Sequence, residues 1–154
     1  SLPSGTGTLV TTADVAALLP SSVAQASAAG VTVSSAAYVT VGGGPSVTLT
    51  TGSTVLLILS VSQYPDSSVV GRYIYTSFAV SGATTIGAAD GDAVHCRTLV
   101  VAASAENNVG ASRATLITGL TPGSNTFTMQ HRTQGGGTAQ IISRQLIVIK
   151  IGQD

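Results

Sequence analysis

A two-residue alternation of apolar and polar side chains is clearest between residues 126 and 133. Phe127, Met129 and His131 fall on one face of this segment, and two threonines and Arg132 fall on the other. Successive side chains of a strand point to opposite faces, so this pattern is typical of a strand with one buried side. The segment is therefore predicted to be a half-buried strand.

The last apolar segment, residues 141–151, differs because both of its faces are apolar. Ile147 and Ile149 share one face, while Leu146 and Val148 lie on the opposite one. A strand that is apolar on both sides needs cover on both. In a small all-β protein the simplest cover for the second side is a neighbouring subunit, so this segment predicts contact with another copy of the chain.

The remainder of the chain from residue 36 onward alternates short apolar runs with turns rich in Gly, Pro, Asn and Asp. The predicted strands comprise residues 37–41, 46–50, 54–62, 72–81, 95–102, 113–120, 126–133 and 139–151. About eight strands with this spacing and little helix predict an all-β fold, an antiparallel jelly-roll sandwich. This jelly-roll domain is expected to span residues 36–154.

Residues 1–35 are predicted to form an N-terminal extended arm. The arm is rich in Ser, Thr and Ala, and it contains one short predicted helix with Thr12 as N-cap and Pro20 at its end. Such a segment buries too little apolar surface to order itself, so we expect it to dock on another protein. The candidate docking residues are the apolar stripe of this helix: Val15, Leu18 and Leu19.

Charge is scarce in this chain of 154 residues. Charged residues make up 8% of it, against about 25% in an ordinary soluble domain, so the surface must be small and polar or must be covered. Six basic and six acidic residues cancel, and no run of Lys or Arg exists to follow a phosphate backbone. The apolar runs are far shorter than the ~20 residues of a membrane helix. We therefore expect neither a nucleic-acid partner nor a membrane span.

Few residues suggest chemistry. A single cysteine, Cys96, excludes an internal disulfide, and its neighbour His95 would point to the opposite face of a strand, so the two cannot pair as nucleophile and base. Asp90 and Asp92 could bind calcium, but the later acidic ligand of a calcium loop is missing, and a plain turn is favoured. We predict no catalytic residue, no metal site and no enzymatic activity.

Two polar residues interrupt apolar faces. His131 should either meet a polar partner or lie at the solvent-exposed end of its strand, because burying an unpaired imidazole is costly. With so few carboxylates in the chain, Arg144 should either pair across a subunit boundary or donate to backbone carbonyls. Both pairs of alternatives stay open from the sequence.

Five segments together resemble a known family in their strand-and-turn style. They are residues 53–60 (STVLLILS), 78–82 (FAVSG), 116–123 (LITGLTPG), 126–132 (TFTMQHR) and 144–149 (RQLIVI). These segments, within a similarity over residues 36–151, resemble the trimeric TNF/C1q-like jelly rolls, which tailed bacteriophages carry in virion proteins as fibre tips and capsid decorations. The resemblance implies a homotrimer about a three-fold axis, without catalytic residues or an obligatory cofactor. The residues expected at its interface are Phe127, Met129, His131, Arg144, Leu146 and Val148.

Two roles follow from the resemblance. The favoured one is a structural virion protein, a capsid decoration or cement protein that docks on the shell of major capsid protein as a trimer and stabilises it. Such a protein is made in the host cytoplasm and is located on the capsid surface of the virion. The alternative is a receptor-binding module of a tail fibre or head fibre that recognises host glycans. It is less favoured because we find no stalk sequence, aromatic residues make up 4% of the chain and Trp is absent.

Overall fold

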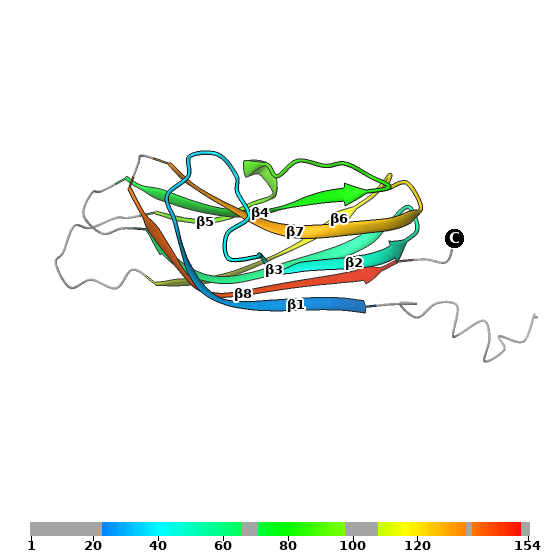
Figure 1. Cartoon of the computed structure of the whole chain (residues 1–154), viewed down its shortest axis with the longest axis horizontal. Helices are drawn as coiled ribbons and strands as arrows, with labels where there is room; N and C mark the ends of the chain where they lie inside the picture. The colour runs from blue at the N-terminus through cyan, green and yellow to red at the C-terminus, as the bar shows by residue number, and fades with distance from the viewer. Residues whose placement is uncertain (1–22, 66–70, 98–107, 135–136, 152–154) are drawn as a thin grey trace, which may run out of the picture.

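The computed structural model describes residues 23–65, 71–97, 108–134 and 137–151. These residues form two four-stranded sheets packed face to face (Figure 1). The strands are β1 (Val23–Val33), β2 (Ser46–Thr51), β3 (Val55–Pro65), β4 (Tyr73–Gly82), β5 (Val94–Arg97), β6 (Val109–Ile117), β7 (Gly123–Gln134) and β8 (Ala139–Lys150). A 3-10 turn, η1, comprises Asp90–Asp92.

Every strand pair in the sandwich is antiparallel. Sheet A has the order β1-β8-β3-β6, and sheet B has the order β2-β7-β4-β5, so the chain changes sheet at almost every connection. The predicted all-β jelly-roll sandwich is confirmed. Seven of the predicted strands overlap with β2 to β8, although residues 37–41 contribute only a single bridge, from Val39 to His131.

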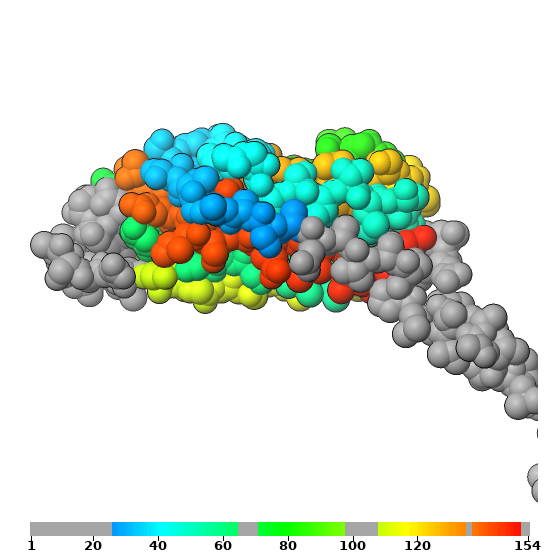
Figure 2. Space-filling view, turned by 60° about the horizontal axis from the view of Figure 1, so that its bottom comes forward, coloured from blue at the N-terminus to red at the C-terminus, as the bar shows by residue number. Residues whose placement is uncertain are grey.

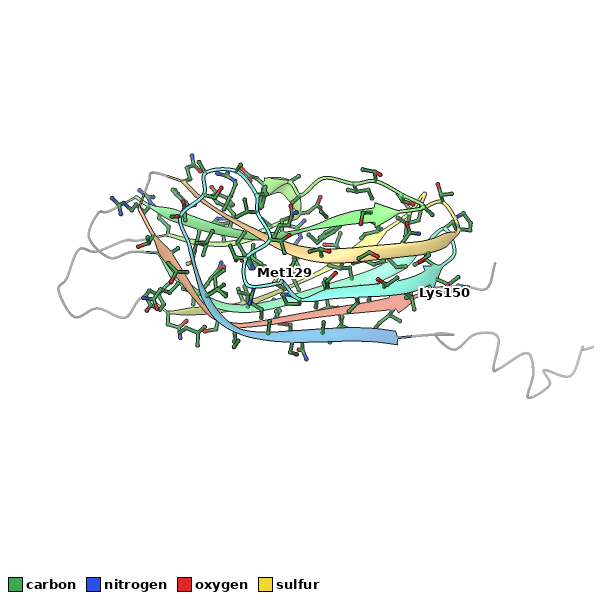
Figure 3. All side chains as sticks on the ribbon, in the orientation of Figure 1. Met129 and Lys150 are labelled. Carbon is green, nitrogen blue, oxygen red and sulfur yellow. The ribbon has the colours of Figure 1, made fainter. Side chains whose placement is uncertain are left out.

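Alternation along the strands builds the interior. Odd-numbered residues of β7 from Asn125 to Thr133 are buried and even-numbered ones are not, as the pattern predicts. Met129 lies between the two sheets (Figure 3). The larger part of the core surrounds Phe127 and Leu57, and a smaller part surrounds Ile74 and Ile141.

The first strand corrects the predicted domain boundary. Residues 23–33 fall in the predicted arm, yet they form β1, which pairs along β8 from Val23 opposite Ile149 to Val33 opposite Ala139. The sandwich thus begins before residue 36. The Ala- and Ser-rich sequence of β1 has little strand propensity of its own, and its strand form depends on the ladder that β8 offers. The predicted helix with Val15, Leu18 and Leu19 lies outside the described residues.

β8 does not keep one alternation along its length. Against β3 the register shifts between Ser62 and Gln63, so Ser62 lies opposite Ser143 while Gln63 lies opposite Ile141. The residue skipped is Ile142, which is 47% exposed. Because of this irregularity, the buried residues are odd-numbered before it and even-numbered after it: Ala139, Ile141, Arg144, Leu146 and Val148.

Candidate functional site

The six residues predicted at a trimer interface lie in the interior of the single chain. Phe127, Met129, His131, Leu146 and Val148 are each 0% exposed, and Arg144 is 3% exposed. The alternation correctly grouped Phe127, Met129 and His131 on one buried face, but the opposite sheet of the same chain covers that face. These side chains are therefore unavailable for contact with another subunit, and the location of the predicted interface is corrected. The homotrimer itself stays a prediction.

His131 meets a polar partner inside the sandwich. Its Nδ1 lies 2.8 Å from Oγ1 of Thr76, and that hydroxyl donates to Oε1 of Gln63 at 2.6 Å. Since the single hydroxyl proton of Thr76 goes to Gln63, Nδ1 of His131 must carry the proton that Thr76 accepts. Burial and the nearby charge of Arg144 lower the pKa of His131 to about 3. The imidazole is thus neutral at ordinary pH.

Arg144 donates to carbonyls within the chain. One of its terminal nitrogens, Nη1, donates to the carbonyl of Val41 at 2.7 Å, and the other, Nη2, donates to that of Ala29 at 2.9 Å. Of the two alternatives open from the sequence, donation to carbonyls is the one observed. The guanidinium therefore ties β8 to β1 and to the segment before β2, which is a structural role.

Among the residues that the structure describes, the outer face of sheet A carries no charged side chain. It is turned toward the viewer in Figure 2, where β1 (blue), β8 (orange to red), β3 (green) and β6 (yellow-green) follow one another. Side chains in matching register divide this face into two parts. The aliphatic end consists of Leu56, Ile58, Ala114, Leu116, Ile147 and Ile149. The serine end consists of Ser27, Ala29, Ser60, Ser62, Gly110, Ser112, Ser143 and Gln145.

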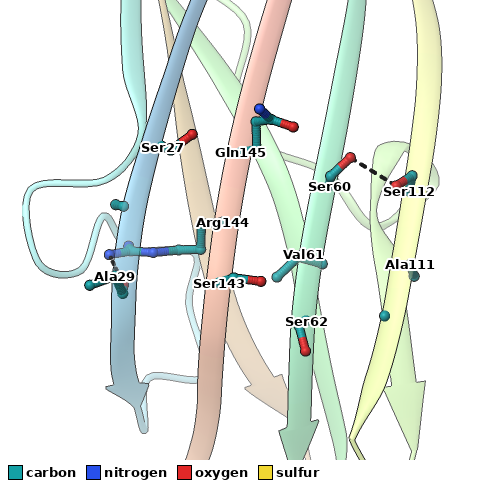
Figure 4. Close-up of a pocket in the computed structure, with 12 residues that line it drawn as sticks. Ser27, Ala29, Ser60, Val61, Ser62, Ala111, Ser112, Ser143, Arg144 and Gln145 are labelled. Carbon is teal, nitrogen blue, oxygen red and sulfur yellow. Dashed lines mark hydrogen bonds between the residues drawn. The ribbon is translucent and has the colours of Figure 1, made fainter.

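A shallow groove of about 620 Å³ lies over the serine end (Figure 4). Its hydroxyls partly satisfy one another, since Ser60 and Ser112 are hydrogen-bonded at 2.8 Å. Arg144 is the charged residue in its lining, and it is buried beneath the face with its donors turned to Ala29 and Val41. The groove thus offers small neutral groups without a nucleophile activated by a base.

The aliphatic end of the same face is partly open to solvent. Leu116 is 60% exposed, and Leu56, Ile58, Ile147 and Ile149 are half-buried in the single chain. In a chain with so few charges, a patch of aliphatic side chains that are partly exposed on the outer face of a sheet is typical of a contact surface. The sequence pattern had assigned Ile147 and Ile149 to a face that needs cover, and they do lie on this outer face.

The outer face of sheet B carries a tyrosine–arginine cluster, which we define as Tyr73, Tyr75, His95, Arg97 and Arg132. The rings of Tyr73 and Tyr75 are stacked with their centroids 5.8 Å apart, and the ring of His95 lies 5.4 Å from that of Tyr75. The Cζ atom of Arg132 lies 4.1 Å from the centre of the Tyr75 ring, and that of Arg97 lies 5.4 Å from the centre of the Tyr73 ring. Cation–π contact stabilises such an arrangement.

Asp90 of η1 anchors one side of this cluster. Its carboxylate accepts two hydrogen bonds from Arg132, of which the one from Nε measures 2.8 Å, and a third at 2.9 Å from the hydroxyl of Tyr38. Hydrogen bonding from Arg132 holds the pKa of Asp90 below its ordinary value, while burial and Asp90 raise the pKa of Tyr38. The carboxylate is thus committed to Arg132 and Tyr38.

The remaining residues with candidate chemistry are separated. His95 is exposed on the outer face and Cys96 is buried, as expected for neighbours in a strand. Burial raises the pKa of the Cys96 thiol to about 12, and the thiol donates to the carbonyl of Gln63 at 3.6 Å. Asp92 lies 3.9 Å from Arg113. Within the described ranges, no three His, Cys, Asp or Glu side chains come close enough to hold a metal ion.

Sequence reasoning missed the tyrosine–arginine cluster. One signal was available, because Tyr73 and Tyr75, and likewise His95 and Arg97, are two residues apart and so share a face. The register that brings Arg132 opposite Tyr75 and His95 opposite the same tyrosine is a tertiary feature.

In the part of the chain that the structure describes, no helix is both long enough and apolar enough to cross a bilayer.

No family model and no curated protein matches this sequence. Among solved structures, the chain is similar to VP2 in the infectious bursal disease virus subviral particle, with a TM-score of 0.55 and 12% identity over 85% of this chain and 33% of VP2. The structure of the Gx strain of that virus gives a TM-score of 0.55 and 14% identity over 86% and 33% of the two chains. Eiger TNF from S. frugiperda gives a TM-score of 0.49 and 13% identity over 82% and 87%.

These similarities concern the fold. The chain spans about a third of the length of the two virus proteins it matches. At 12% to 14% identity, the likeness establishes that the described strands are arranged as a jelly roll of the kind found in a virus-particle protein.

Proposed function

We propose that this chain is a structural virion protein, a capsid decoration protein that docks on a shell of major capsid protein as a homotrimer and stabilises it. The observation that carries the proposal is the uncharged outer face of sheet A, with its exposed aliphatic end. The jelly-roll fold shared with VP2 of a virus particle supports the same role. In this role the protein is made in the host cytoplasm and located on the capsid surface.

The contact between subunits is assigned to the aliphatic end of sheet A. Leu56, Ile58, Leu116, Ile147 and Ile149 come from three adjacent strands and form two neighbouring rows in the register of the sheet. Burying these side chains against two other copies would remove apolar area from water at about 25 cal/mol per Å². No charge of the described residues on this face would have to be desolvated, because they carry none.

Docking on the shell is assigned to the segment before β1, which includes Val15, Leu18 and Leu19. Truncation tests this part of the proposal directly, and the start of β1 at Val23 determines where the truncated variant should begin. A variant that starts at residue 23 keeps the whole sandwich, so it should remain folded and trimeric by circular dichroism and sedimentation while losing cosedimentation with capsids. A variant that starts at residue 36 lacks β1 and should lose folding as well.

The two truncations separate docking from folding. If the variant starting at residue 23 binds capsids as well as the full chain does, the segment before β1 is not the docking element. If the full chain fails to bind capsids at all, the decoration role is excluded.

A second candidate function is a fibre module that recognises host glycans, and the tyrosine–arginine cluster favours it. Three of the four tyrosines, Tyr38, Tyr73 and Tyr75, gather in or beside this cluster, so the low aromatic content no longer argues against a sugar-stacking surface. Labelling the protein on the particle distinguishes the two roles. Decoration predicts signal over the whole shell, and a fibre predicts signal at fibre tips.

A further inference from the structure

We propose that the tyrosine–arginine cluster on the outer face of sheet B binds a saccharide that carries a carboxylate. Arg97 would hold the carboxylate, and the ring surfaces of Tyr73 and His95 would contact the sugar ring. This inference rests on the second candidate function, to which it assigns a site and a ligand class. It does not depend on docking through the segment before β1 or on contacts of sheet A.

The first argument is convergence. Residues from three strands meet in two adjacent rows of sheet B: Arg132, Tyr75 and His95 lie opposite one another in the first, and Gln134, Tyr73 and Arg97 in the second. The two phenylalanines and His131 are buried in the core, so the aromatic rings at the surface of the described residues are those of His95 and the tyrosines, of which Tyr38, Tyr73 and Tyr75 lie in or beside the cluster. Gathering them on one patch of an otherwise Ser- and Thr-rich face creates a local stacking surface.

The second argument is the state of the two cations. Arg132 is neutralised by Asp90, with which it forms a bidentate pair. Arg97 is exposed and contacts the Tyr73 ring, and among the residues that the structure describes no carboxylate lies within 4 Å of it. A guanidinium presents a planar fork of donors that matches a carboxylate. Arg97 is therefore the group of this cluster that is available to an anion.

The third argument is a fixed amide donor beside the rings. The hydroxyl of Tyr75 donates to Oε1 of Gln134 at 2.9 Å. This hydrogen bond orients the amide, whose Nε2 carries two N–H donors in the row that also holds Tyr73 and Arg97. An amide donor, a guanidinium and flat ring surfaces are the groups that hydroxyl, carboxylate and C–H faces of an acidic pyranose require.

A nucleic acid fits this surface less well. Single-stranded nucleic acids bind to aromatic platforms that lie within a basic groove, because each phosphate needs a cation. The cluster offers Arg97 as its single uncommitted guanidinium, and Asp90 adds a negative charge next to Arg132. One carboxylate is the anion that this balance of charge accommodates.

The experiment is a titration of the full chain with matched saccharides, followed by isothermal calorimetry and by chemical shifts of the tyrosine rings. The charged probes are trigalacturonate and 3′-sialyllactose, and their neutral counterparts are trigalacturonate methyl ester and lactose. We expect saturable binding of at least one charged probe, about tenfold weaker binding of its neutral counterpart, and shift changes at Tyr73.

Two variants separate charge from site. Arg97→Gln should weaken binding of the charged probe about tenfold and leave binding of the neutral one unchanged. Lys150→Gln is the control, because it removes the same charge from the end of β8 that lies far from the cluster (Figure 3). It should leave both affinities unchanged. Each variant is first checked for an unaltered circular dichroism spectrum and melting temperature.

Four outcomes overturn the inference. With the unmodified chain, they are absence of binding by both charged probes, equal affinity for charged and neutral probes, and tighter binding of a short single-stranded DNA than of either saccharide. With the variants, the outcome is an equal loss of affinity for the charged probe in Arg97→Gln and Lys150→Gln. Equal affinity for charged and neutral probes would leave the glycan-binding function intact and exclude only the acidic class. Capsid cosedimentation of Arg97→Gln should match that of the unmodified chain, so failure here is distinguishable from failure of the decoration role.

Discussion

The outer face of sheet A carries serines, alanines and aliphatic side chains, whereas the outer face of sheet B gathers tyrosines, arginines and a histidine. The two faces share one core, although sheet A is built from strands of 9 to 12 residues and sheet B includes the shorter β2 and β5, of 6 and 4 residues. The described residues of the first face carry no charge to desolvate, so this face suits contact with another protein surface. The second has directional donors and stacking rings and suits a small polar ligand. The difference supports the separate roles that we propose for the two sides of one sandwich.

The largest expected effect comes from the core that both faces share. Phe127 is fully buried, so Phe127→Ala should lower the free energy of unfolding by about 3 to 5 kcal/mol, measured by urea denaturation. Because both faces depend on this core, subunit contact and ligand binding should be lost together as the chain unfolds. A variant that lost one and kept the other would show that the two sheets fold independently.

A charge placed on the outer face of sheet A should break the contact that we propose between subunits. Ile147→Asp puts a carboxylate into the aliphatic end, where burial of an unpaired charge is costly, and we expect a shift toward monomer of about 100-fold, or ~3 kcal/mol, in sedimentation equilibrium. Thr126→Asp adds the same charge to the outer face of sheet B and should leave the oligomeric state unchanged. Equal effects of the two variants would contradict the assignment of the contact to sheet A.

Acid should destabilise the chain through His131, which lies beneath both faces. The pKa of His131 is about 3 in the folded chain, against an ordinary value of 6.5. Above pH 6.5 neither state binds the proton, so this contribution to stability is fully present. As the pH falls from 6.5 toward 3, only the unfolded chain takes up the proton, and the free energy of unfolding drops by about 1.4 kcal/mol per pH unit.

Chemical denaturation between pH 7 and pH 4 measures this slope. His131→Gln keeps a side chain that can donate to Thr76 without titrating, and it should flatten the slope. His95→Gln removes the exposed histidine of the cluster and should leave the slope in place. If the free energy of unfolding of His131→Gln fell with pH as steeply as that of the unmodified chain, protonation of carboxylates would be the cause of the acid destabilisation instead.

The smallest expected effect concerns the anchor of the tyrosine–arginine cluster. Asp90→Asn removes the charge that pairs with Arg132 at the surface, where such pairs contribute about 0.2 to 1 kcal/mol. Thermal unfolding should therefore change little. The expected signature is a change in the ring chemical shifts of Tyr38 and Tyr75, since the Arg132 guanidinium loses its partner. A loss of several kcal/mol would mean that η1 supports the core and not only the cluster.

Local patterns were sufficient for the fold class and for several strand faces. The alternation of Phe127, Met129 and His131 predicted that they share a buried face, because strand geometry alone determines which side chains lie together. The neighbours His95 and Cys96 were separated on the same ground. Such a pattern does not say whether the apolar face packs against the same chain or against another subunit. The core face of β7 was therefore mistaken for a subunit interface.

What remained depended on pairing between distant segments. β1 was missed because its Ala- and Ser-rich sequence becomes a strand only against β8, and the phase of β8 changes at a register shift that no periodicity predicts. The tyrosine–arginine cluster joins Tyr75 to Arg132, 57 positions away, through the register of β4 and β7. Side-chain alternation is a local property of the backbone and can be read from residue order, whereas register and cover arise from contacts between strands, which only the folded chain creates.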